Sequence, residues 1–102
     1  LYTIHGELSA YLTHSALKTE IVPVLASVQD NLRMGDVFAA RRVDTVYHAA
    51  AYKHVPLVEA NPAEALKNNL LGTRNIAQLA HQHCVQHFVL ISTDKAVRPT
   101  NV

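Results

Sequence analysis

The chain of 102 residues has a single cysteine, only three glycines and no long apolar run. One cysteine, Cys84, excludes an intramolecular disulfide framework and is typical of a reducing compartment. No stretch approaches the roughly 18 consecutive apolar residues that a membrane-spanning helix needs, and no N-terminal stretch has the pattern of a signal peptide. We therefore expect a cytoplasmic location and no direct membrane contact by this segment.

Blocks of like charge are also lacking. The 9 basic and 8 acidic residues give a formal net charge of +1 and are spread along the chain. A protein that binds duplex nucleic acid normally carries a clustered basic face, so we expect no nucleic-acid partner. Hydrophobic residues make up 49% of the chain, enough for one compact domain. The chain begins at Leu1 inside a periodic apolar pattern, which favours a piece of a longer protein.

The first half predicts a helix, a strand and a second helix. Apolar residues recur every three or four positions over 1–17, although Gly6 weakens such a helix by roughly 1 kcal/mol and makes it depend on packing. The β-branched stretch 21–25 contains a proline that cannot donate a ladder hydrogen bond, which predicts an edge strand. Asp30 or Asn31 is expected to cap the second helix. That helix runs to two arginines, Arg41 and Arg42, whose charges suit the end of a helix dipole.

The second half repeats this alternation. Residues 45–48 are predicted as a strand, followed by a long loop. A helix is predicted over 62–83, with Asn61 as its N-cap and Glu64 in a capping-box-like pair. The continuous apolar run 88–91 is typical of a central parallel strand that is covered on both faces. The order indicates an α/β fold with a doubly wound parallel sheet.

In such sheets, ligands bind outside the carboxyl ends of the strands. Three segments occupy those ends: 27–30, 49–54 and 92–95. The three alanines at 49–51 would let a flat cofactor ring approach the backbone, or would pack a strand end tightly on a helix. The last segment brings a hydroxyl, a carboxylate and an amine together, and its alternative is an ordinary polar turn.

The seven histidines of the chain invite a metal hypothesis. The only cluster is His81, His83, Cys84 and His87, and helical residues two apart do not share a face. We therefore expect no metal site, and we interpret Cys84 as a small buried or boundary residue. His48, at a strand end, is interpreted as a structural histidine.

Two long strings carry a family resemblance, VYHAAAYKHVPLVEANPAEALKNNLLGT and FVLISTDKAVRPTNV. They closely resemble the nucleotide-sugar 4,6-dehydratases of bacterial polysaccharide biosynthesis, the CapD-like family of the extended short-chain dehydrogenase/reductase superfamily. The resemblance covers essentially the whole chain and is strongest over 44–102. It implies a Rossmann-like domain with strand order 3-2-1-4-5-6, of which residues 1–102 form the central part with strands 3, 4 and 5. Strands 1 and 2, which separate strand 3 from strand 4, are missing, so the predicted edge strand has no neighbour within this chain. Larger members also carry a membrane-anchored N-terminal region.

The resemblance also implies site residues. It assigns seven residues to cofactor binding, two to substrate binding and three to catalysis. Ser27 and Val28 match the segment beside the adenine ring, and Asn69 matches a helix asparagine that braces the active-site strand. One departure is Ala26, where the family usually has glycine. The remaining matches are Ala49, Ala50, Ala51 and Ser92 for the cofactor, Lys53 and His54 for the nucleotide sugar, and Thr93, Asp94 and Lys95 for catalysis.

The implied reaction uses NAD or NADP and a UDP-N-acetylhexosamine of the UDP-GlcNAc type. Hydride leaves C4, Lys95 removes the C5 proton, Asp94 protonates the departing C6 hydroxyl, and hydride returns to C6. Thr93 lies near the sugar O4. The product is a 4-keto-6-deoxy sugar nucleotide for polysaccharide, capsule or lipopolysaccharide O-antigen synthesis. Because strand alternation separates Asp94 from its neighbours, we expect the backbone to bend at 93–95.

The alternatives are a nucleotide-sugar epimerase and a non-catalytic NAD(P)-binding module. Epimerases of the superfamily lack the Asp94–Lys95 pair, which favours the dehydratase. A phosphoacceptor receiver domain would need an aspartate at the end of a middle strand, and 45–51 has none. The family's glycine-rich phosphate loop and its Tyr-or-Met and Lys pair match nothing here. We therefore expect the isolated chain to be inactive, and the full-length protein to form a homo-oligomer.

Overall fold

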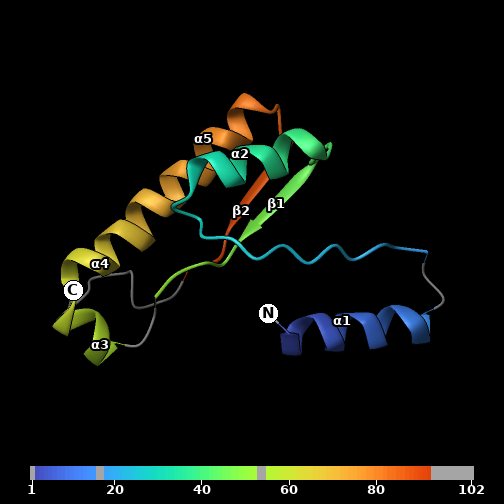
Figure 1. Ribbon diagram of the computed structural model, residues 1–102, viewed down its shortest axis with the longest axis horizontal. Helices are drawn as coiled ribbons and strands as arrows, with labels where there is room; N and C mark the ends of the chain where they lie inside the picture. Colours follow the sequence, from blue (N-terminus) through green and yellow to red (C-terminus); the bar gives the residue numbers. More distant parts are fainter. Residues whose placement is uncertain (1, 16–17, 53–54, 93–102) are drawn as a thin grey trace.

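The computed structural model describes residues 2–15, 18–52 and 55–92 (Figure 1). Two helices precede the first strand, and four consecutive helical segments separate the first strand from the second. The elements in chain order are α1 (Tyr2–Ser15), α2 (Asn31–Ala40), β1 (Thr45–His48), α3 (Val55–Ala60), α4 (Pro62–Leu66), the π-helix η1 (Lys67–Gly72), α5 (Thr73–Gln82) and β2 (His87–Leu90).

The sheet consists of β1 and β2, which pair in parallel with Thr45 opposite His87 and His48 opposite Leu90. One further bond extends the ladder, because the Ile91 N–H donates to the His48 carbonyl at 2.9 Å. Both strands and their parallel pairing were predicted and are confirmed. The prediction that the second strand is covered on both faces is wrong, since all four of its residues are exposed. Within the described ranges, α2 and α5 pack on one side of the sheet only (Figure 1).

The predicted strand at 21–25 is wrong. This segment runs stretched out between α1 and α2 (Figure 1) but forms no ladder, and the described sheet contains two strands only. A strand exists only where a neighbour supplies hydrogen-bond partners, and Pro23 removes one donor besides. Local β propensity is therefore insufficient here.

Helix α1 confirms the predicted helix, but no residue of it is buried. The apolar side chains Ile4, Leu8 and Tyr11 are all exposed. Near its end, Thr13 and Ser15 donate hydroxyl hydrogen bonds to the carbonyls four residues earlier, at 2.9 and 2.8 Å. Packing on the rest of the described chain therefore does not support this helix. None of the helices described is long and apolar enough to cross a bilayer.

Helix α2 begins as predicted. The Asp30 side chain accepts a hydrogen bond from the Arg33 N–H at 2.9 Å, which satisfies one free donor of the first turn. The prediction that Arg41 and Arg42 lie in its last turn is wrong, because the helix ends one residue before Arg41. The helix ends at Ala40, and Arg41 follows it with extended backbone at φ −134°.

The predicted long helix is present but divided into α4, η1 and α5. Asn61 precedes it as expected, yet its side chain caps nothing and donates instead to the Leu57 carbonyl at 3.0 Å. The capping-box prediction is therefore wrong. The reason is α3, a short helix in the segment predicted as loop, whose carbonyls lie within reach of the Asn61 amide. The π-helical turn at 67–72 was not predicted.

The core lies between α2 and α5. Phe38 of α2 is buried against Ile76, Leu79 and Ala80 of α5, and partly buried side chains surround them. The end of α5 supports this core through a Schellman motif: Cys84 N–H bonds to the His81 carbonyl, and Val85 N–H to the Ala80 carbonyl. Cys84 takes the left-handed conformation (φ 55°) and is exposed, so its predicted burial is wrong.

Candidate functional site

Two of the three predicted ligand-binding segments meet one stretch of helix, η1 and the first turn of α5. The first segment, 27–30, leads into α2, and the second follows β1. Polar side chains of the helix hold both segments through their backbone atoms. The helix therefore sets the positions of both segments.

The first segment is held at Val28. Its carbonyl accepts a hydrogen bond from the Asn75 side chain at 2.8 Å. Its side chain packs on Gly72, where an added Cβ would lie 2.7 Å from the Val28 Cγ2 atom. The Ser27 hydroxyl accepts a hydrogen bond from the Gln29 N–H at 3.2 Å, and the Ser27 carbonyl accepts one from the Asp30 N–H at 3.1 Å, which closes a turn. Ala26 needs no glycine-like backbone, because Cys84 is the one non-glycine residue with positive φ in the described ranges.

The second segment is held at Tyr52. The Asn69 side chain pairs with its backbone: Tyr52 N–H donates to Asn69 Oδ1 at 2.8 Å, and Asn69 Nδ2 donates to the Tyr52 carbonyl at 3.0 Å. This two-bond arrangement copies the pairing of neighbouring strands. Asn68 adds a third bond to Asn69 Oδ1 at 3.0 Å. Asn69 thus braces the loop after β1.

The alanines of this second segment are exposed and carry no bulk beyond a methyl group. Ala51 N–H bonds to the Ala49 carbonyl at 3.2 Å, which makes a tight turn directly after the strand. The backbone of Ala49, Ala50 and Ala51 is therefore open to close approach by a flat group. Of the two interpretations given above, exposure favours a ligand surface over tight packing on a helix.

His48 links the end of β1 to the same helix. Its Nε2 atom lies 2.9 Å from the Thr73 hydroxyl oxygen, and Thr73 donates in turn to the Asn69 carbonyl at 2.6 Å. Only 5% of His48 is exposed, and this burial lowers its pKa because the charged imidazolium loses its hydration. The interpretation of His48 as a satisfied structural histidine is confirmed.

The third segment follows β2. Ser92 is exposed, one residue beyond the bond from Ile91 to His48. The predicted catalytic residues Thr93, Asp94 and Lys95 lie outside the described residues, as does the bend expected there. The same holds for Lys53 and His54.

The structure adds four residues that sequence reasoning did not assign to the site: Asn68, Gly72, Thr73 and Asn75. All four lie within the helix predicted over 62–83. The available signal was the density of amide and hydroxyl side chains at 68–75, which is unusual on a helix face that packs on a sheet. The π-helical turn at 67–72, which only the structure shows, also marks this part of the helix, since such turns recur at functional sites. In the described part of the chain, no three metal-ligating side chains gather.

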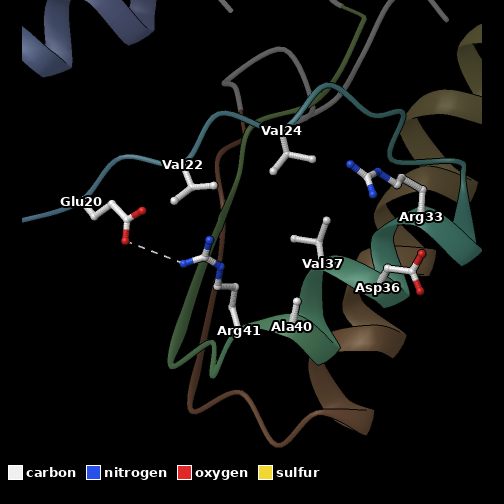
Figure 2. Close-up of a pocket in the computed structure, with 8 residues that line it drawn as sticks. All are labelled: Glu20, Val22, Val24, Arg33, Asp36, Val37, Ala40 and Arg41. Atoms are coloured by element: carbon white, nitrogen blue, oxygen red, sulfur yellow. Dashed lines mark ion pairs between the residues drawn. The ribbon is translucent and has the colours of Figure 1, made fainter.

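A hollow lies away from these loops, between the unpaired segment at 20–24 and α2 (Figure 2). Val22 and Val24 of the segment and Val37 of α2 line it, and Glu20 and Arg41 form a 3.9 Å ion pair beside them (Figure 2). Both charged side chains are largely exposed, so the pair contributes little to stability. Its lining residues are Glu20, Val22, Val24, Arg33, Asp36, Val37, Ala40 and Arg41.

Comparison with known proteins gives a consistent result. The family model described as "Polysaccharide biosynthesis protein" matches residues 1–102. The capsular polysaccharide biosynthesis protein CapD of Staphylococcus aureus is 51% identical over 104 residues, covering 96% of this chain and 17% of CapD. The probable polysaccharide biosynthesis protein EpsC of Bacillus subtilis is 47% identical, covering 100% of this chain and 17% of EpsC. The UDP-N-acetylglucosamine 4,6-dehydratase (inverting) of Campylobacter jejuni is 41% identical over 78 residues, 76% of this chain and 23% of that enzyme.

Solved structures show the same fold. Pen from Bacillus thuringiensis superposes with a TM-score of 0.70 at 35% identity, covering 76% of this chain and 23% of Pen. The UDP-glucose 4-epimerase of Bifidobacterium longum, in complex with NAD+ and UDP, gives a TM-score of 0.71 at 28% identity, with 76% and 23% covered. The predicted fold class, a partial Rossmann-like α/β arrangement, is confirmed. The chain spans about one sixth of CapD and EpsC, 17% in each case.

Proposed function

Because this chain belongs to the polysaccharide biosynthesis protein family, we propose that it is the central part of an NAD(P)-dependent enzyme that modifies a nucleotide sugar. The reaction we infer is the 4,6-dehydration of a UDP-N-acetylhexosamine. Two relatives support this choice: CapD, named for capsular polysaccharide biosynthesis, and the Campylobacter UDP-N-acetylglucosamine 4,6-dehydratase.

The observation that carries the proposal is the clamped alanine turn after β1. A backbone that is open, free of bulky side chains and pinned by Asn69 suits the close approach of a dinucleotide. Ser27 and Val28 would hold the adenine side of the dinucleotide, and Ala49 to Ala51 together with Ser92 would hold the rest of it. The described residues therefore fit one wall of a cofactor site.

The residues after β2 perform the proton transfers. A dinucleotide, when bound, would supply the hydride acceptor. Lys95 removes the C5 proton, Asp94 delivers a proton to the departing C6 hydroxyl, and the Thr93 hydroxyl lies near O4. General acid–base groups of this kind contribute about 10²–10⁴-fold to a rate. Lys53 and His54 belong to the loop that faces the nucleotide sugar.

The second candidate is a UDP-sugar 4-epimerase. It is favoured by the UDP-glucose 4-epimerase of Rickettsia canadensis, which is 48% identical over 64 residues and covers 63% of this chain and 19% of that enzyme. The Asp94–Lys95 pair, which epimerases of the superfamily lack, favours the dehydratase.

The test uses the complete protein that contains this chain, incubated with UDP-N-acetylglucosamine. We expect loss of one water from the substrate by mass spectrometry and a 4-keto-6-deoxy product by NMR. Lys95→Ala should lower the rate by at least about 100-fold while the dinucleotide stays bound. Lys18→Ala, at an exposed lysine between α1 and α2, is the matched control. Undiminished turnover in Lys95→Ala would refute the role of Lys95, and a C4 epimer without loss of water would favour the epimerase.

A further inference from the structure

The turn of three alanines is tied at both of its ends to a single residue. Before it, His48 contacts Thr73, and the Thr73 hydroxyl donates to the Asn69 carbonyl. After it, the Tyr52 backbone pairs with the Asn69 side chain. We propose that His48 and Thr73 are positioning residues that hold Asn69, and through it the backbone at 49–52, at the level a dinucleotide requires.

The directions of the hydrogen bonds follow from proton counting. A threonine hydroxyl has one proton, and the 2.6 Å bond to the Asn69 carbonyl uses it. Thr73 must therefore accept from His48, which places a proton on His48 Nε2. The hydroxyl alone makes this link to Asn69, because the Thr73 N–H bonds to the Leu70 carbonyl. Removing the hydroxyl thus removes the hydrogen-bonded link that runs from His48 through Thr73 to the Asn69 carbonyl.

The geometry distinguishes this pair from ordinary core packing. His48 and Thr73 are 25 residues apart and belong to different layers of the fold, so their bond sets where the helix lies relative to the strand end. The backbone carbonyl of Asn69 accepts the bond from Thr73, and the side-chain amide of Asn69 pairs with the Tyr52 backbone. A shift of η1 along the strand therefore moves the Tyr52 backbone, whereas a loosened apolar contact elsewhere in α5 does not.

The first measurement needs no ligand. In the complete protein, Thr73→Val keeps the side-chain volume but removes the hydroxyl, and we expect hydrogen exchange of the Tyr52 amide to become at least about tenfold faster. Thr73→Ser restores the hydroxyl and should restore slow exchange. Thr13→Val is the matched control, because Thr13 also donates to the carbonyl four residues earlier but lies in α1. His48 should carry its proton on Nε2 in ¹⁵N spectra of the unmodified protein.

The second measurement rests on the proposed function. Thr73→Val should weaken NAD+ binding by about tenfold, and Thr13→Val should leave it unchanged. If Tyr52 exchange stays slow in Thr73→Val, or if His48 carries its proton on Nδ1, the positioning role is refuted. If exchange responds as expected but the unmodified protein binds neither NAD+ nor NADP+, the proposed function fails and the positioning role stands. Should Thr73→Val not fold, Thr73→Ala removes the same hydroxyl with a smaller side chain and provides the same comparison.

Discussion

Two regions of this chain contain similar apolar side chains and use them in opposite ways. Between α2 and α5, Phe38 and Ile76 are buried in a shared core. In α1, Ile4 and Tyr11 are exposed, and the stretched segment that follows pairs with nothing in the described sheet. Helix formation therefore does not require burial here, and an apolar pattern does not guarantee it. What differs is whether a complementary surface lies opposite.

The largest expected effect compares one residue type in the two regions. Ile76→Ala should lower the free energy of unfolding by about 2–5 kcal/mol, because the side chain is 4% exposed and its removal leaves a cavity. Ile4→Ala should change it by no more than about 0.5 kcal/mol, because Ile4 is 59% exposed. Urea denaturation of the two variants measures both. Equal losses would show that α1 is packed as firmly as α5, which would contradict the comparison.

A smaller effect compares two helical glycines. Gly72→Ala should destabilise by about 1–3 kcal/mol, because its Cβ would lie 2.7 Å from Val28 and the segment at 27–30 would have to move. Gly6→Ala should stabilise by up to about 1 kcal/mol, since nothing lies within 4 Å and alanine is the better helix former.

Thermal unfolding of both variants checks the sign in each case. The double variant Gly72→Ala with Val28→Ala is the control, and it should recover part of the loss because the contacting methyl groups are gone. A stabilised Gly72→Ala variant would show that Val28 can move aside at no cost.

The smallest effect is a pH dependence confined to the sheet region. Burial lowers the pKa of His48 from its ordinary value near 6.5, so the unfolded chain binds this proton more readily than the folded chain. The contribution of His48 to stability is therefore fully present above about pH 6.5, and it is lost as the pH falls through the lower folded value. Urea titrations between pH 7.5 and pH 5 measure the slope. His48→Gln should reduce that slope, and His14→Gln in α1 is the control; an unchanged slope in His48→Gln would contradict the assignment.

Prediction from the sequence succeeded where the deciding interactions are local. The Asp30 cap of α2 needs only a side-chain oxygen and an N–H three residues later. Helix α1 was predicted from its apolar spacing and is present, although none of its residues is buried as the expected dependence on packing would require. The strand at 45–48 was predicted with the bounds that the structure shows. The family strings were likewise readable without coordinates.

Prediction failed where a partner distant in the sequence decides. The segment at 21–25 has strand-forming residues but no neighbouring ladder. Asn61 looked like a cap, and the unpredicted α3 diverted its amide to Leu57. The exposure of β2 depends on which helices cover it, and no property of its own apolar run carries that information.

The sequence by itself determined the α/β class, the positions of most helices and both strands, and the family. Each of these rests on hydrogen bonds and apolar periodicity within a few turns of chain, or on strings of residues. Only the tertiary structure decided that Asn69 pairs with Tyr52, that Thr73 joins His48 to Asn69, and that Gly72 must lack a side chain. The pairs Tyr52–Asn69, His48–Thr73 and Val28–Gly72 are each far apart in the sequence, and such residues meet only after the sheet and its helices have packed.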